Sequence, residues 1–385
     1  MPYITVPQTR KYHQFSMDEL LFGDVTRQVV KKPTSWKNID TCTRTYFVER
    51  PNSKLIHAAN IQGLIRRLDW FNEQFDFLFK ENRENLYRHF EIPKKSGSGM
   101  RPIDAPNESL SNALRVLKGI FESDFHVLYH TSAYAYIKKR CTIDAVKEHQ
   151  RNESRWFLHT DFSGFFPATT LDFVMSQFAM VFPFSEVVRY PQGEKALRKA
   201  LSLCFLNGGL PQGTPISPII TNVMMIPIDH VLSNSLRNFD KHSFVYTRYA
   251  DDIYISCRVD FNYRKVVGHI IKTLREFGAP YEVKEEKTHY GNNNGKNYML
   301  GVLLNKENKI SLGHQRKKEL RSRLFNYLSD KKNHIPTPVD ELYNLRGNMS
   351  YCKMVEPEWY KAVINHYNEE FGIDLEKSID SDIAA

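Results

Sequence analysis

The chain has 385 residues, of which 41% are hydrophobic, and its 53 Lys and Arg outnumber 44 Asp and Glu to give a net charge of +9. This length predicts two or three domains, and the basic balance favours a polyanionic partner such as a nucleic acid. Five cysteines without a Cys-x-x-Cys pair argue against a zinc site or a disulfide framework. With no apolar leader or membrane-length apolar run, we expect a cytoplasmic protein with no membrane partner.

The N-terminal part contains one clear helical pattern. Apolar residues at 61, 64, 65, 68, 71, 75 and 78 share one face over Ile61–Phe79. A basic, glycine-rich turn at 97–105 predicts a hairpin, and Leu110–Phe121 follows as a helix.

The middle of the chain mixes strand and helix patterns. We expect strands at 156–160, 244–248, 253–257 and 298–304, with helices near 170–181, 193–205, 218–235 and 262–277. Beyond residue 311 the pattern is helical. Over His314–Ser329, one face carries Leu320, Leu324, Tyr327 and Leu328 while basic residues occupy the rest. The acidic tail at 374–385 is expected to fray.

Two adjacent carboxylates, Asp251 and Asp252, lie between two β-forming stretches, so they are expected to cap a hairpin. Crowding two anions costs several kcal/mol unless a cation offsets them. Hard carboxylate oxygens suit Mg²⁺, with Mn²⁺ as the alternative ion. The pair therefore predicts a two-metal site for phosphoryl transfer. A surface turn that happens to contain two aspartates is the alternative.

A second acid, Asp161, ends another β-rich run, Trp156–Pro167. Taken alone, it is equally well an ordinary acid at the end of a strand. A third segment, Asn207–Pro218, combines glycines and prolines with amide and hydroxyl groups. Glycines of this kind let the backbone approach a ligand closely.

In content and order, these segments resemble the motifs of reverse transcriptases, specifically the bacterial kind found in retrons, group II introns and anti-phage defence systems. The matching segments are 94–106, 133–144, the Asp161 run, 210–218, the Tyr-Ala-Asp-Asp hairpin, 284–288 and 297–305. The resemblance implies an α+β right-hand polymerase with fingers, a palm of antiparallel sheet packed with helices, and a helical thumb. The implied domains are a mostly helical N-terminal extension at 1–90, fingers at 91–155, palm at 156–310 and thumb with tail at 311–385.

The resemblance also implies roles for particular residues. Asp161 and Asp251 would bridge two metal ions, Asp252 would be a peripheral third ligand, and the carbonyl of Phe162 an extra one. Lys287, preferred over Lys284 because a Lys-Thr pair is the family pattern, would protonate the pyrophosphate leaving group. The remaining residues are expected to contact the nucleotide or the primer–template: Lys94 or Lys95, Arg101, Gln212 and Gly213 for the nucleotide, and Tyr249, Gly301, Arg316, Lys317 and Arg321 for the primer–template.

Sugar selection is assigned to Phe166, five residues after Asp161, where the family places an aromatic that crowds the 2′ position. An apolar ring offers no partner to a 2′-hydroxyl, so dNTPs are favoured over NTPs. The alternative is that Phe166 is a core residue, as we expect for Phe165.

The sequence thus predicts an RNA-directed DNA polymerase that makes cDNA from dNTPs on a dedicated non-coding RNA, in a retroelement or an anti-phage defence system. Two alternatives stay open. One is a defence enzyme that makes repetitive, partly untemplated or protein-primed DNA, and the other is a non-catalytic, nucleic-acid-binding oligomeric scaffold. Further candidate partners are an effector protein or second polymerase from the same operon, and a second copy of the chain.

Overall fold

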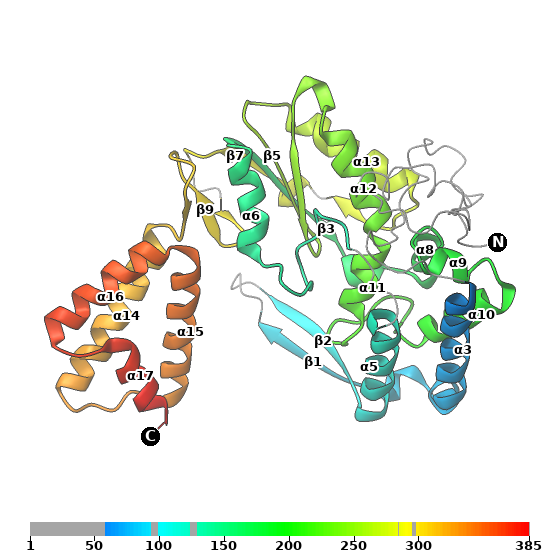
Figure 1. Ribbon diagram of the computed structural model, residues 1–385, viewed down its shortest axis with the longest axis horizontal. Coiled ribbons are helices and arrows are strands. Elements are labelled where there is room, and N and C mark those ends of the chain that lie inside the picture. Colours follow the sequence, from blue (N-terminus) through cyan, green and yellow to red (C-terminus); the bar gives the residue numbers. More distant parts are fainter. Residues whose placement is uncertain (1–57, 94–98, 124–128, 284, 295–297, 385) are drawn as a thin grey trace, which may run out of the picture. The chain divides into compact units, whose positions relative to one another are not determined.

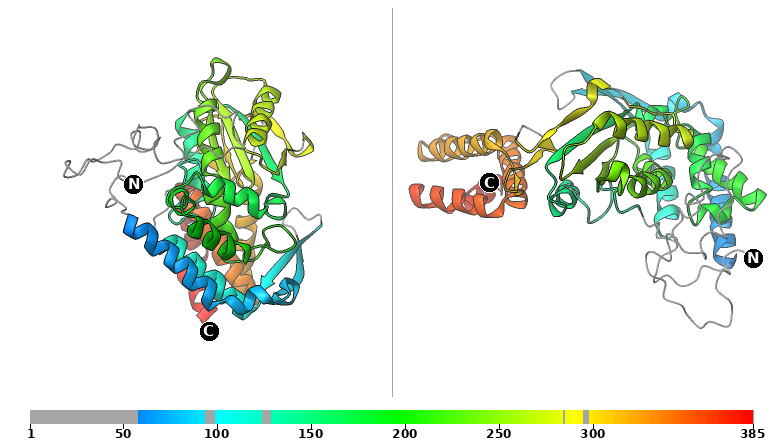
Figure 2. Two further views of the ribbon diagram at one scale, coloured as in Figure 1. Left: turned by 90° about the vertical axis from the view of Figure 1, so that its right-hand side faces the viewer. Right: turned by 90° about the horizontal axis from the view of Figure 1, so that it is seen from above.

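A computed structural model of the protein describes residues 58–93, 99–123, 129–283, 285–294 and 298–384 (Figure 1, Figure 2). These residues form two compact units, each assembled from separate stretches of the chain. The first unit contains the described residues up to Cys141, with Leu158–Ile255 and Asn262–His289. The second contains Thr142–Phe157, Ser256–Phe261 and the described residues from Tyr290 onward. In these ranges, no helix combines the length and apolarity that crossing a membrane requires.

The first unit begins with helices and a long hairpin. The pattern at 61–79 forms two helices, α3 (Ala58–Gln74) and α4 (Asp76–Lys80), and a 3₁₀ turn, η3 (Arg83–Leu86), follows. Strands β1 (Tyr87–Pro93) and β2 (Met100–Pro106) then pair antiparallel, as the basic turn predicted. Helix α5 (Glu108–Ser123) covers the stretch predicted as 110–121.

The sheet that carries the acids has the strand order β4-β5-β3-β6, and β7 also pairs with β3. Its strands are β3 (Trp156–Ser163), β4 (Val245–Tyr249), β5 (Asp252–Cys257), β6 (Glu282–Val283) and β7 (His289–Asn292). The helices between them are α7 (Phe165–Ala168), α8 (Leu171–Phe178), α9 (Phe184–Val187), α10 (Pro191–Ser202), α11 (Ser217–Met224), α12 (Ile226–Leu236) and α13 (Tyr263–Glu276). Two 3₁₀ turns, η4 (Phe239–Lys241) and η5 (Glu285–Lys287), also lie in the first unit, whereas residues 156–157 of β3, 256–257 of β5 and 290–292 of β7 belong to the stretches of the second unit. The predicted α+β class is confirmed.

Aromatic side chains fill much of the core of this unit. Phe121 of α5 meets Phe184 edge to face at 5.1 Å between ring centroids, and Phe178 lies 4.5 Å from Phe184. A second cluster stacks Phe162 on Tyr281 at 5.4 Å. Such rings bury a large apolar area each, which ties the helices to the sheet.

The second unit holds α6 (Thr142–Arg151), a small sheet and four further helices. The sheet consists of β8 (Tyr298–Met299), β9 (Val302–Leu304) and β10 (Ile310–Ser311), in the order β10-β9-β8. The helices α14 (His314–Lys332), α15 (Val339–Val355), α16 (Pro357–Phe371) and α17 (Leu375–Ala384) pack as a bundle (Figure 2). The predicted apolar face of α14 is confirmed, because Leu320, Leu324, Tyr327 and Leu328 are all buried.

The expectation that the acidic tail frays is wrong. Residues 375–384 form α17, and its Leu375 and Ile379 are completely buried. Its acids are also paired, since Lys331 of α14 lies 2.7 Å from Asp382. The tail is held because its apolar residues recur at helical spacing, a signal that its high acidic content concealed.

Candidate active site

The Tyr-Ala-Asp-Asp segment caps a hairpin, as predicted. Strand β4 ends at Tyr249, Asp251 lies in the turn, and Asp252 is the first residue of β5. Branched and aromatic residues on both sides favour the extended backbone. The chain reverses at Ala250, which has a left-handed φ of +59°. Both aspartates are half-buried at the end of the sheet.

Strand β3 brings Asp161 to the same end of the sheet. β3 neighbours β5, and the amide of Phe162 donates a 3.1 Å hydrogen bond to the carbonyl of Asp251. The two acid segments are thus joined backbone to backbone. The ring of Phe162 is buried in the core. The three acids that the sequence proposed as a set are therefore assembled from strands that are far apart in the chain.

Cationic or polar partners engage two of the three carboxylates. Lys287 Nζ lies 2.6 Å from Oδ2 of Asp161. His159 Nε2 lies 2.8 Å from Oδ1 of Asp252, and the His159 ring stacks on Tyr254 at 4.4 Å. His159 was not among the site residues expected from the sequence. The one feature of the sequence that could have identified His159 is its position two residues before Asp161 on the same strand, which places both side chains on one face of the sheet.

The electrostatics of the site favour a bound cation. Burial, followed by the neighbouring charges of Asp252 and Asp161, raises the pKa of Asp251 to about 6. Oδ1 of Asp161 is buried and has no hydrogen-bond partner among the described residues. A buried carboxylate oxygen without a donor is costly. The donor set, three carboxylates, is the kind that Mg²⁺ and Mn²⁺ prefer.

The carboxylates do not surround a common point in this arrangement. Within the described ranges, no three His, Cys, Asp or Glu side chains converge closely enough to hold a metal ion. Lys287 instead supplies the positive charge next to Asp161, and its ammonium forms an ion pair with one oxygen of that carboxylate. The residues fit divalent ions in chemistry and charge, and Asp161, Asp251 and Asp252 would hold them.

The glycine-rich segment packs against strand β2. The amide of Asp104 donates to the carbonyl of Gln212 at 2.8 Å. Gly213 has φ +115°, and a β-carbon there would lie 2.9 Å from Cγ2 of Ile103, so only glycine fits without displacement. Arg101, also on β2, lowers the pKa of Asp251 through its charge. Gln212 and Gly213 thus lie against β2, and Arg101 of the same strand is the one residue of these three whose charge acts on Asp251. Lys94, Lys95 and the rival Lys284 lie outside the described residues.

The two neighbouring phenylalanines after Asp161 differ in burial. Phe165 is only 2% exposed, which confirms it as a core residue. Phe166 is half-buried and meets Phe165 edge to face at 5.6 Å. The carbonyl of Phe166 accepts a 3.0 Å hydrogen bond from Leu210, at the start of the glycine-rich segment. Phe166 is thus less buried than Phe165, and its backbone is hydrogen-bonded to the glycine-rich segment.

Most of the residues expected to contact the primer–template lie in the second unit and have partners there. Arg316 donates to the carbonyl of Gly301 at 2.9 Å, and Gly301 forms the β8–β9 turn with φ +86°. Lys317 lies 2.6 Å from Glu356. Arg321 lies 5.6 Å above the Trp359 ring, a cation–π contact. Tyr249, in the first unit, is half-buried at the end of β4.

Comparisons with known proteins agree with the motifs. A family model described as "Reverse transcriptase (RNA-dependent DNA polymerase)" matches residues 92–327, more than half of the chain. The retron Ec83 reverse transcriptase of Escherichia coli is 28% identical over 308 residues, covering 77% of this chain and 91% of the relative. The retron Ec73 reverse transcriptase of Escherichia coli is 26% identical over 288 residues, covering 74% and 87%.

Among solved structures, a telomerase from Candida albicans in complex with a fragment of telomeric RNA aligns with a TM-score of 0.42 and 11% identity. That alignment covers 77% of this chain and 60% of the telomerase chain. The family assignment rests on the sequence match, which includes all three acids and the glycine-rich segment. The chain belongs to the reverse transcriptase family of RNA-dependent DNA polymerases.

Proposed function

We propose that Asp161, Asp251 and Asp252 hold two Mg²⁺ ions and that this site extends a primer with dNTPs along an RNA template. Members of this family work with divalent metal ions and RNA templates. When bound, such ions lower the pKa of the attacking 3′-hydroxyl and neutralise the leaving pyrophosphate. The observation that carries the proposal is the buried oxygen of Asp161, which lacks a donor among the described residues, beside an Asp251 whose pKa is raised to about 6.

Lys287 is proposed to hold a proton for the pyrophosphate. Its hydrogen bond with Asp161 raises the pKa of this ammonium, so it stays protonated at neutral pH. With a cation held at Asp161, the Lys287 ammonium would be available to donate its proton to the leaving group. Arg101, Gln212 and Gly213 are proposed to line the nucleotide pocket, and half-buried Phe166 to crowd the 2′ position of the sugar.

The double variant Asp251→Asn/Asp252→Asn tests this assignment. Each substitution removes a metal ligand while keeping the size of the side chain, and we expect dNTP incorporation on a primed RNA template to fall by roughly 10³-fold or more. Asp172→Asn is the matched control, because Asp172 is a surface acid whose side chain is 83% exposed. A folded double variant that incorporates dNTPs at the wild-type rate would contradict the active site proposed here.

A dedicated non-coding RNA is the proposed template, since the two Escherichia coli relatives described above are named as retron enzymes. Nucleic acid that co-purifies with the chain is then expected to contain one abundant RNA and DNA complementary to part of it. Repetitive DNA without an RNA counterpart would favour the untemplated alternative instead. Expressing the native operon with and without Asp251→Asn, followed by phage plating, tests the proposed defence role.

A further inference from the structure

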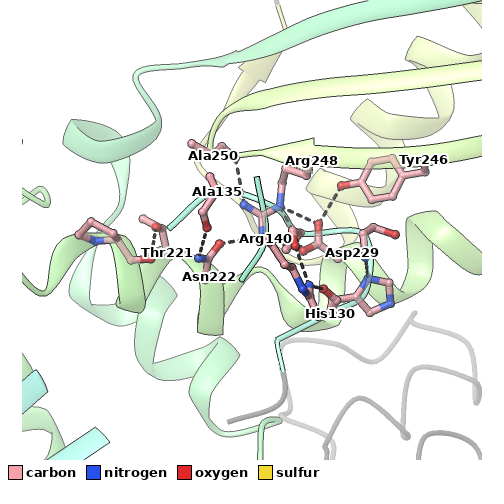
Figure 3. Close-up of polar contacts among 12 residues, drawn as sticks. His130, Ala135, Arg140, Thr221, Asn222, Asp229, Tyr246, Arg248 and Ala250 are labelled. Carbon is pink, nitrogen blue, oxygen red and sulfur yellow. Dashed lines mark hydrogen bonds and ion pairs between the residues drawn. The ribbon is translucent and has the colours of Figure 1, made fainter. Parts of the chain in front are cut away.

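A fully buried arginine lies beneath the catalytic hairpin. Arg248, on β4, is 0% exposed, and so is its partner Asp229 on α12 (Figure 3). The two side chains meet in a bidentate pair, with Nε 2.8 Å from Oδ1 and Nη2 2.7 Å from Oδ2. Tyr246 donates a further 2.8 Å hydrogen bond to the same carboxylate. Removing two charges from water is costly, so this pair needs a reason beyond stability.

The guanidinium also holds the turn that carries the acids. Its Nη1 donates to the carbonyl of Ala250 at 3.0 Å (Figure 3). That carbonyl belongs to the peptide unit leading into Asp251. Ala250 has a left-handed φ of +59°, a conformation that is unfavourable for a residue with a β-carbon. Strain of this kind persists only where surrounding contacts impose it, and the Arg248 hydrogen bond is such a contact.

The backbone of Arg248 holds a second segment, the loop before α6. Its amide donates to Ser132 at 2.7 Å, and its carbonyl accepts from Tyr134 at 2.9 Å. Asn222 of α11 completes the connection, since it accepts from Arg248 at 3.4 Å and donates to the carbonyl of Ala135 at 2.8 Å. Arg248 therefore fixes the position of both the turn that carries Asp251 and the loop at the start of the motif segment 133–144.

A purely structural ion pair would not need this geometry. Replacing a buried ion pair with apolar residues of similar volume is often neutral or stabilising, so such a pair is weak evidence for a stability role. The hydrogen bond from Arg248 to the Ala250 carbonyl, in contrast, directly fixes the orientation of the Ala250–Asp251 peptide unit. Groups that hydrogen-bond to metal ligands and orient them, without contacting the metal, typically contribute 10–100-fold in metal affinity.

We propose that Arg248, buried by its pair with Asp229, is a positioning residue that fixes the Ala250–Asp251 peptide and so sets the metal affinity of the site. The proposal rests on the proposed role of Asp251 as a metal ligand. It assigns to Arg248 no contact with substrate.

Two variants and one control separate positioning from stability. Arg248→Lys keeps the charge but loses the planar fork that reaches both Asp229 and Ala250. Tyr246→Phe is the control, because it removes a buried hydrogen bond to the same Asp229 carboxylate and leaves the turn alone. Mn²⁺ binding is measured by electron paramagnetic resonance on the nucleic-acid-free protein, together with Tm and the Mg²⁺ dependence of dNTP incorporation.

We expect Arg248→Lys to weaken Mn²⁺ binding roughly tenfold or more and to raise the half-saturating Mg²⁺ concentration in parallel. Tyr246→Phe is expected to lower Tm while Mn²⁺ affinity stays within about twofold of the wild type. Equal Mn²⁺ affinity in both variants and the wild type would overturn the proposal.

A triple apolar variant, Arg248→Met/Asp229→Leu/Tyr246→Phe, covers the case in which Arg248→Lys does not fold. Removing the whole polar cluster leaves no buried charge without a partner, so the fold is expected to persist. The proposal requires weakened Mn²⁺ binding in this folded protein. Wild-type binding, or failure of the triple variant to fold, contradicts it. If Asp251→Asn itself binds Mn²⁺ like the wild type, the proposed function fails instead.

Discussion

Asp251→Asn is expected to stabilise the metal-free protein at neutral pH while it destroys activity. In the folded state, burial and the charges of Asp252 and Asp161 raise the pKa of Asp251 from its usual 3.8 to about 6. The folded protein therefore binds this proton more tightly than the unfolded chain does. At neutral pH the carboxylate is charged in both states, and its charge is less favourable in the folded one.

The sign and size of the effect follow from this difference. Below pH 3.8, both states hold the proton and the group costs nothing. As pH rises from 3.8 to the folded value of about 6, the wild type loses stability, and above that value the decrease is complete. At about 1.4 kcal/mol per pH unit, the interval corresponds to at most about 3 kcal/mol, and partial exposure reduces it to about 1–3 kcal/mol. The Asn variant does not titrate and keeps that stability.

Thermal unfolding from pH 4 to pH 8 in EDTA measures the difference. We expect Asp251→Asn and wild type to have similar Tm values near pH 4, and the variant to exceed the wild type by roughly 2–12 °C at pH 7.5. Millimolar Mg²⁺ should narrow this gap, because bound ions stabilise the wild type and not the variant. Asp172→Asn, at an exposed surface acid, should show no comparable dependence on pH.

A Tm difference between Asp251→Asn and the wild type that does not change with pH would refute the electrostatic reasoning. So would a wild type that is more stable than the variant at pH 7.5 in EDTA. Either result would mean that burial and the neighbouring acids do not raise the pKa of Asp251 as their positions imply, and a cation at this site would no longer be required to offset the charge.

Three further outcomes are expected. Phe166→Ala should raise the ratio of kcat/KM for GTP over dGTP by roughly one to two orders of magnitude, measured by steady-state incorporation on a primed RNA template; an unchanged ratio in an active variant would make Phe166 a core residue. Lys287→Gln should lower the maximal rate of single-turnover incorporation by roughly 10²–10⁴-fold, with a small change in the apparent Kd for dNTP. An unaltered maximal rate would mean that Lys287 takes no part in the chemical step. Charge reversal at Arg316, Lys317 and Arg321 should weaken template–primer binding and flatten its salt dependence by about one unit of slope for each phosphate interaction that the variant no longer makes. Identical binding across a salt series would mean that this face of α14 is solvent-exposed and contacts no phosphate.

Local sequence patterns determined much of this protein. Branched and aromatic residues around Asp251 and Asp252 predicted the hairpin, and the spacing of Leu320, Leu324, Tyr327 and Leu328 identified the buried face of α14. Both signals depend on neighbours within a few residues, where backbone geometry alone decides which side chains share a face. The expected roles of the three acids came from motif order, since no local pattern distinguishes Asp161 from an ordinary acid at the end of a strand.

Tertiary structure decided the partners of the charged groups. His159 and Asp252 are 93 residues apart in sequence, and Lys287 and Asp161 are 126 apart. The acids of the tail show the same dependence, because Asp382 pairs with Lys331, 51 residues earlier. Arg248 interrupts a β-forming stretch of the sequence, and only the packing of α12 against β4 supplies its carboxylate. A charge is stable in the interior only where a distant segment brings its counter-charge, and sequence spacing does not encode which segment that is.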